Sequence, residues 1–206
     1  MLPRTPGILR RLFPKVLFRL DTGNRKEVFL TFDDGPQPEV TAFVLDTLAT
    51  FGAKASFFLI GNQAAQFPDL VNRIKSEGHS VGHHTQNHLN ALQVSKEAFL
   101  EDVKAGAETV GGLLFRPPYG KLTPAIYNSL KSNYRIVLWD IIAEDYEQSY
   151  TAEQCLQKVL KQLRPGSIIV LHDSVKCYEK LQYLLPELLK ELNKREYRVL
   201  ALPNEV

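Results

Sequence analysis

A regular alternation of strand-type and helix-type segments most constrains how this 206-residue chain can fold. Residues 27–34 form a β-prone run that stops at a Gly35-Pro36 turn, and residues 39–51 then place apolar side chains at helical spacing. We expect strands over 27–34, 53–61, 80–84, 113–116, 134–142, 167–172 and 197–202, and helices over 39–51, 67–77, 96–110, 123–133, 152–163 and 180–194. Such alternation predicts a single α/β domain with a parallel sheet, either closed as a barrel or open and doubly wound.

The amino-acid composition excludes some classes of protein. Hydrophobic residues make up 44% of the chain and charged residues 23%, with a net charge of +2, which is typical of a globular protein. The sequence lacks a dense basic stripe with interleaved aromatic residues, so we expect no nucleic-acid partner. Two cysteines, Cys155 and Cys177, are too few for a disulfide scaffold. We expect both cysteines to be reduced, semi-buried thiols. For the oligomeric state, we favour a monomer.

The first 26 residues form a basic arm. Residues 1–20 contain five basic residues and no acidic one: Arg4, Arg10, Arg11, Lys15 and Arg19. Pro14 and Lys15 interrupt the apolar run that a signal peptide needs, and no later segment approaches the ~20 apolar residues of a membrane span. We interpret residues 1–26 as an arm packed on a domain of residues 27–206, with a membrane-surface helix as the alternative. We expect a cytoplasmic or membrane-peripheral location, or an extracytoplasmic one if a leader is missing.

Chemically reactive residues follow one predicted strand after another. Ligands collect at the carboxyl ends of the strands in parallel β/α folds. The residues at those ends are Asp33 and Asp34, then His84 and His88, then Arg116 to Tyr119, then Asp145, and then His172 and Asp173. With five histidines in the whole chain, this repetition predicts one functional site.

The spacing of His84 and His88 lets both imidazoles reach one metal ion, although a polar loop remains an alternative. A carboxylate from another strand would complete a set that leaves coordination positions open, as a hydrolytic zinc site requires. Asp33 and Asp34 face opposite ways, so one could bind the metal while the other serves as a general base. The alternative for this pair is an Asx turn. We interpret His79 as structural, and His83 as a residue behind the site or on the surface.

Four short motifs resemble those of one enzyme family. They are Thr31-Phe32-Asp33-Asp34-Gly35-Pro36, His84-Thr85-Gln86-Asn87-His88, Arg116-Pro117-Pro118-Tyr119 and Leu171-His172-Asp173. In order and spacing they resemble the motifs of the polysaccharide deacetylases, the NodB-homology enzymes of carbohydrate esterase family four. The resemblance covers residues 27–202 and implies a distorted (β/α) barrel of about seven parallel strands. It also implies a divalent metal, usually zinc, with cobalt or nickel often accepted.

The resemblance also implies roles for individual residues on the metal side of the site. Asp34, His84 and His88 would be the metal ligands, and Asp33 would be the general base. Arg116 would hold the carboxylate of Asp33, although a strand-end arginine can also be a surface charge.

On the leaving-group side, His172 would be the general acid, oriented and kept protonated by Asp145. The backbone amide of Tyr119 would donate to the oxyanion, beside Pro118 in the substrate site. Leu171 would line the pocket for the acetyl methyl group, although a leucine at a strand end is core in most folds.

One position departs from the family pattern. The family often places a tryptophan directly after the aspartate that serves the catalytic histidine, whereas this chain has Tyr146 after Asp145. We expect Tyr146 to contact substrate, and we expect the change to alter substrate preference. The single tryptophan, Trp139, falls inside the predicted fifth strand and is expected in the core.

Amide hydrolysis needs an activated water, a stabilised oxyanion and a proton for the departing amine, and each role has a candidate here. We therefore predict a hydrolase that removes N-acetyl groups, with O-acetyl groups as a second option, from peptidoglycan or chitin-type oligosaccharides. The alternatives are a related-barrel metal amidohydrolase acting on a non-sugar amide, and a non-catalytic carbohydrate-binding module.

Overall fold

A curled parallel sheet forms the centre of the molecule. The computed structural model describes residues 11–204. Its strands are β1 (Glu27–Asp33), β2 (Ser56–Leu59), β3 (Ser80–His83), β4 (Leu114–Phe115), β5 (Arg135–Ile136), β6 (Ile141–Ile142), β7 (Ile168–His172) and β8 (Arg198–Val199). The strand order is β5-β4-β3-β2-β1-β7-β6, with every pair parallel and β8 paired to β1. The predicted α/β fold with a parallel sheet is confirmed.

The connection between β5 and β6 requires the sheet to curl. These strands are consecutive in the chain but lie at opposite ends of the strand order. Five residue steps separate Ile136 from Ile141, and a fully extended chain covers at most about 18 Å in that number of steps. The two edges must therefore approach each other, which makes the sheet a nearly closed barrel rather than an open, doubly wound sheet.

The predicted continuous strand over 134–142 is wrong. The chain leaves the sheet at residues 137–140, because polar partners from elsewhere bind this stretch. The carbonyl oxygens of Val137 and Leu138 accept hydrogen bonds from the Arg116 guanidinium, and the buried Asp140 pairs with Arg164 at 2.5 Å. Trp139 lies in this break instead of inside a strand.

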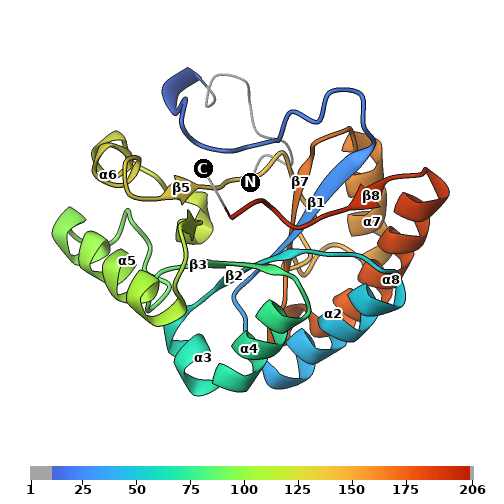
Figure 1. Cartoon of the computed structure of the whole chain (residues 1–206), viewed down its shortest axis with the longest axis horizontal. Coiled ribbons are helices and arrows are strands. Elements are labelled where there is room, and N and C mark those ends of the chain that lie inside the picture. The colour runs from blue at the N-terminus through green and yellow to red at the C-terminus, as the bar shows by residue number, and fades with distance from the viewer. Residues whose placement is uncertain (1–10, 205–206) are drawn as a thin grey trace.

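Helices cover the outer face of the barrel (Figure 1). They are α2 (Pro38–Thr50), α3 (Gly61–Gln66), α4 (Pro68–Ser76), α5 (Lys96–Val110), α6 (Pro124–Leu130), α7 (Ala152–Gln162) and α8 (Tyr178–Lys194). Two 3₁₀ turns, η1 (Pro118–Gly120) and η2 (Val175–Cys177), follow β4 and β7. Helix α3 was not predicted, because only Gly61 and Ala64 of its six residues are buried and no apolar period marks it. No helix within residues 11–204 is both long and apolar enough to cross a membrane.

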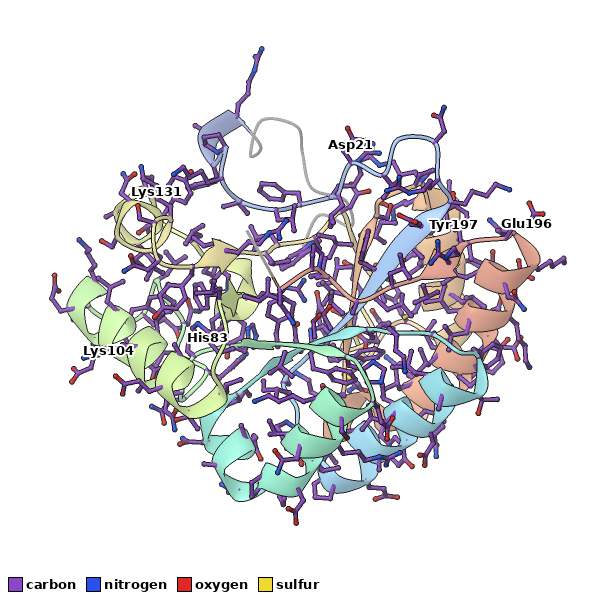
Figure 2. The ribbon with its side chains drawn as sticks, viewed as in Figure 1. Asp21, His83, Lys104, Lys131, Glu196 and Tyr197 are labelled. Carbon is purple, nitrogen blue, oxygen red and sulfur yellow. The ribbon has the colours of Figure 1, made fainter. Side chains whose placement is uncertain are left out.

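The hydrophobic core lies on both faces of the sheet, because both faces are covered. All seven residues of β1 are buried, as expected for a central parallel strand. One large cluster packs β1, β2 and β7 against α2, α7 and α8, and a second lies beneath α5 and α6. Charged side chains such as Lys104 and Lys131 project outward, whereas His83 lies inside (Figure 2).

The described part of the N-terminal arm lies across the end of the barrel. Phe13, Val16 and Phe18 are buried in the second cluster. The Leu17 amide donates to the Ile136 carbonyl at 2.8 Å, and other backbone bonds tie residues 17–20 to residues 138 and 166. The segment therefore bridges the gap between β5 and β7. Arg4 and Arg10 lie outside the described residues.

Candidate active site

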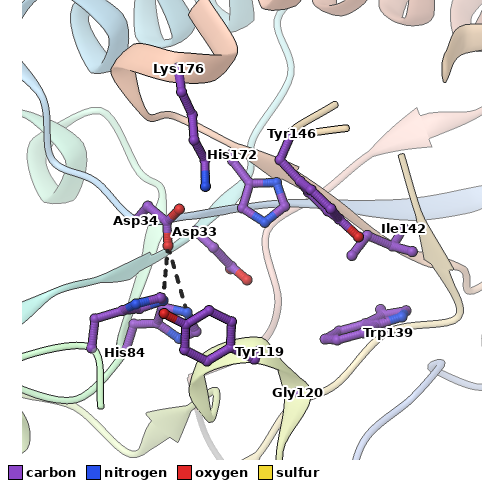
Figure 3. Close-up of a pocket in the computed structure, with 11 residues that line it drawn as sticks. Asp33, Asp34, His84, Tyr119, Gly120, Trp139, Ile142, Tyr146, His172 and Lys176 are labelled. Carbon is purple, nitrogen blue, oxygen red and sulfur yellow. Dashed lines mark ion pairs between the residues drawn. The ribbon is translucent and has the colours of Figure 1, made fainter. Parts of the chain in front are cut away.

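A pocket of about 310 Å³ opens at the carboxyl ends of the strands (Figure 3). It is lined by Asp33, Asp34, His84, His88, Tyr119, Gly120, Trp139, Ile142, Tyr146, His172 and Lys176. The strands that supply these residues are neighbours in the sheet, so side chains distant in sequence converge on one cavity. This is the edge at which the sequence predicts a site.

The paired aspartates at the end of β1 occupy different environments. Asp33 is the last residue of the strand and binds Arg116, with 2.6 Å between Oδ1 and Nη1. Asp34 has a φ of 77°, so the chain turns out of the strand there and directs the second carboxylate elsewhere. Gly35 permits this turn, because a Cβ at that position would lie 2.2 Å from Oδ2 of Asp173. Strand geometry and the turn together separate the two carboxylates.

Asp34 faces two imidazoles. Its Oδ1 lies 3.3 Å from Nε2 of His88 and 3.9 Å from Nε2 of His84. Burial disfavours the charged form of Asp34, but the hydrogen bond from His88 and the positive charge of His172 outweigh burial and hold the pKa of this carboxyl well below its ordinary value. Asp34 is thus ionised at neutral pH, as a carboxylate ligand of a metal would be.

These three residues fit a divalent metal ion. Nδ1 of His84 lies 2.7 Å from the Arg116 carbonyl oxygen, which fixes Nδ1 as the donor and leaves the Nε2 lone pair facing Asp34. Burial lowers the pKa of His84 to about 4, so the ring is neutral, as a ligand must be. One donor atom from each of the three residues lies within 4.8 Å of the others, close to the spacing of ligands on a tetrahedral zinc ion.

Arg116 anchors Asp33 from behind. Its guanidinium is fully buried, with its centre 4.0 Å from the Phe58 ring centroid. Besides Asp33, Nη1 donates to Oγ1 of Thr31 at 2.8 Å, and Nε and Nη2 donate to two backbone carbonyl oxygens. The arginine is therefore not a surface charge; it fixes the position of the Asp33 carboxylate.

His172 and Asp145 form a second charged pair at the pocket. Nδ1 of His172 lies 2.7 Å from Oδ1 of Asp145, and the His172 backbone amide donates to Oδ2 at 2.8 Å. Burial lowers the pKa of His172, but the charge and hydrogen bond of Asp145, with the charges of Asp34 and Asp33, raise the pKa to about 9. The imidazole is consequently protonated at neutral pH, with its other nitrogen turned toward the pocket (Figure 3).

Aromatic and apolar groups form the remaining wall. The Tyr119 ring centroid lies 4.7 Å from that of His88, and the Tyr146 ring meets His172 edge-on at 5.2 Å. Trp139 is 8% exposed, and its indole lines the pocket as well as packing in the core, so the expectation of a purely core residue was incomplete. Gly120 has a φ of 63° and packs so closely that a Cβ would lie 2.4 Å from this indole.

Two predicted substrate-site residues do not line the pocket, and for His83 one of the two predicted alternatives is excluded. Leu171 is fully buried in the core and pairs with Phe32 in the sheet; because side chains alternate along β7, it faces away from the pocket that His172 lines. Pro118 is also buried and is not among the lining residues, and Ile142 lines the pocket instead. His83 is not on the surface: it is fully buried and stacks on Phe115 at 4.8 Å, because both faces of β3 are covered.

His79 packs as a structural residue. Its Nδ1 accepts a hydrogen bond from the Ala55 amide at 3.1 Å, outside the pocket. Asp173 was placed at the predicted site without a role, and Lys176 was missed. Asp173 is buried, which raises its pKa to about 8, and it accepts from Oγ1 of Thr41 at 2.6 Å. Lys176 lines the pocket four residues beyond His172, and its place on the loop after a site-bearing strand was the available signal.

The fold and the site define a class: a (β/α)-barrel protein of hydrolase type, with a carboxylate held by an arginine, a three-residue cluster of metal-ligand type and a protonated histidine paired with an aspartate. Residues 21–135 match the family model for polysaccharide deacetylase. The chain belongs to the polysaccharide deacetylase family, which confirms the resemblance drawn from its four motifs.

Individual relatives agree with this assignment. A peptidoglycan-N-acetylglucosamine deacetylase of Bacillus cereus is 36% identical over 182 residues, covering 85% of this chain and 85% of the relative. A chitooligosaccharide deacetylase of Azorhizobium caulinodans is 33% identical over 160 residues, covering 74% and 76%. A crystal structure of a peptidoglycan N-acetylglucosamine deacetylase in complex with 4-naphthalen-1-yl-N-oxidanyl-benzamide superposes with a TM-score of 0.88 at 30% identity, covering 97% of this chain and 95% of that one. The protein is a carbohydrate deacetylase.

Proposed function

We propose that this enzyme is a metal-dependent hydrolase that removes the acetyl group from an N-acetylated carbohydrate of peptidoglycan or chitin type. The separation of Asp33 from Asp34 is the observation that carries the proposal. One carboxylate is held by Arg116 and stays clear of the metal cluster, while the other faces two imidazoles. The names of the relatives, which act on peptidoglycan and on chito-oligosaccharides, support the substrate class.

Asp34, His84 and His88 hold the ion, with zinc favoured and cobalt or nickel as alternatives. When bound, a divalent ion supplies Lewis-acid chemistry: it acidifies water and polarises a carbonyl oxygen. Asp33 lies at the same strand end, and its carboxylate accepts the proton of the attacking water. Arg116 keeps that carboxylate in one orientation throughout.

His172 donates the proton that the departing amine requires. An amine is a poor leaving group unless it is protonated, and an imidazolium paired with Asp145 has that proton available at neutral pH. An alkoxide depends less on the acid, so a site with a persistently protonated histidine favours N-acetyl over O-acetyl substrates. The Tyr119 amide is the proposed donor to the oxyanion.

The test combines metal content with acetate release. Protein stripped with a chelator should release no acetate from chitotetraose or peptidoglycan, and zinc or cobalt should restore the release. His84→Ala should lower metal content per folded protein, whereas His79→Ala, a histidine outside the pocket, should not. Full metal occupancy in a His84→Ala, His88→Ala double variant would overturn the ligand assignment. Binding of these sugars without any acetate release would indicate a non-catalytic module.

A further inference from the structure

A single ammonium group faces the active site. Among the described residues that line the pocket, Lys176 is the only lysine or arginine. It lies on η2, directly after the β7 strand end that carries His172. Its side chain is exposed, and the structure gives the ammonium no hydrogen bond or ion pair among residues 11–204. Figure 3 shows the Nζ atom pointing into the pocket between Asp34 and His172.

The other charges of the site are already compensated. Asp33 pairs with Arg116 at 2.6 Å, and Asp145 pairs with His172 at 2.7 Å. A divalent ion held by Asp34 would more than neutralise that carboxylate, so Lys176 would face a pocket with no negative charge left to bind it. An uncompensated cation in a cleft attracts anions and raises their local concentration.

The aromatic and apolar residues of the pocket suggest where a sugar ring would bind relative to Lys176. Tyr119, Trp139, Ile142 and Tyr146 present aromatic and apolar surface that suits a sugar ring but offers no charge. Lys176 lies on the side of Asp34 and His172, and Tyr119 and Trp139 lie across the cavity from it (Figure 3). The cavity measures about 310 Å³, so a carboxylate on the sugar being deacetylated, or on a sugar bonded to it, would lie within reach of Lys176.

We infer that Lys176 binds a carboxylate of the substrate, so that the enzyme prefers an acidic N-acetylated sugar, with its carboxylate near the acetamido group, over a neutral one. A carboxylate suits the site better than a phosphate, because phosphate sites gather several donors or a bidentate arginine, whereas this pocket offers one ammonium. The inference rests on the proposed deacetylase function and adds a specificity-determining residue to it.

The test compares two soluble oligomers that differ in carboxylates. One is chitotetraose, which is neutral, and the other is a tetrasaccharide of alternating N-acetylglucosamine and N-acetylmuramic acid without peptide. The measured quantity is the ratio of kcat/KM for the acidic oligomer to kcat/KM for the neutral one. Lys176→Met should lower this ratio by about 2- to 5-fold, mainly through KM, as expected for the loss of one exposed charge contact.

Further variants separate charge from shape. Lys176→Arg should retain most of the wild-type ratio, and Lys176→Glu should lower it below that of Lys176→Met. About 0.5 M salt should lower the wild-type ratio but leave that of Lys176→Met unchanged, because salt screens an exposed charge. Lys104→Met, which removes an exposed lysine of α5 remote from the pocket, should not change the ratio.

Two failures are distinguishable. If wild-type enzyme loaded with metal releases acetate from neither oligomer, the proposed function is wrong. If it releases acetate and Lys176→Met changes both oligomers by the same factor, the function stands and the inference about Lys176 is overturned.

Discussion

Replacement of Arg116 by methionine should strongly destabilise the protein. The guanidinium is fully buried and binds the carboxylate of Asp33, the hydroxyl of Thr31 and two backbone carbonyls. Asp33 is 3% exposed. Without the guanidinium, its carboxylate would be a buried charge that has lost its arginine partner. Removal of one partner from a buried ion pair costs about 3–5 kcal/mol, which is a large share of the ~5–15 kcal/mol that stabilises a typical domain.

Urea-induced unfolding of the metal-free protein, followed by circular dichroism, measures this loss. The Arg116→Met, Asp33→Asn double variant should be less destabilised than the sum of the two single variants by about 2 kcal/mol or more, because it leaves neither charge uncompensated. Arg73→Met is the matched control: Arg73 also binds two carboxylates, Asp46 and Glu77, but at the surface, so its loss should cost no more than about 1 kcal/mol. Equal losses for Arg116→Met and Arg73→Met, or simple additivity in the double variant, would refute the reasoning.

The remaining predictions concern the pocket itself. Asp33→Asn should retain the metal but lose about 10²- to 10⁴-fold in turnover, as commonly follows loss of a general base, whereas Asp34→Asn should lose both; equal metal loss in the two variants would reverse the assignment. Because the acid form of His172 is the proposed active form and its pKa is raised to about 9, the rate should fall as pH rises through that value. Asp145→Asn should move this limb of the pH–rate profile to lower pH, and an unmoved limb would mean that another group titrates there. Gly120→Ala should lower stability by about 1–3 kcal/mol through overpacking and shift the fluorescence of the single tryptophan, since the new Cβ would press on its indole.

The barrel was predictable where short apolar runs end in polar residues. β1 and β7 pass through the centre of the sheet, so their sequences are mostly apolar up to Asp33 and His172, and the ends of the strands mark the site directly. The break between β5 and β6 could not be predicted in this way. The run through residues 134–142 looks like one strand, and what divides it is hydrogen bonding by Arg116 and ion pairing by Arg164, both distant in sequence.

The direction in which each side chain points explains the errors among the site residues. The motifs predicted which residue types gather at the site, but not which side of a strand each faces. Leu171 precedes His172 and therefore faces the core, while Trp139 reaches the pocket because the strand around it is interrupted. Lys176 belongs to no motif, and only the path of η2 brings it into the cavity.

The arm that bridges β5 and β7 affects where an independently folding fragment can begin. The family match starts at residue 21 and the first strand at Glu27, so either would be a natural choice of N-terminus for a shortened protein. Both choices would remove Phe13, Val16 and Phe18 from the core and delete the backbone bonds at Leu17 and Leu20. The barrel edges would then lose this bridge, and residues 137–140, the stretch that carries Trp139 and receives Arg116, would be the chain connection left between β5 and β6. A fragment trimmed to the family boundary would therefore lose part of the packing behind the wall of its own active site.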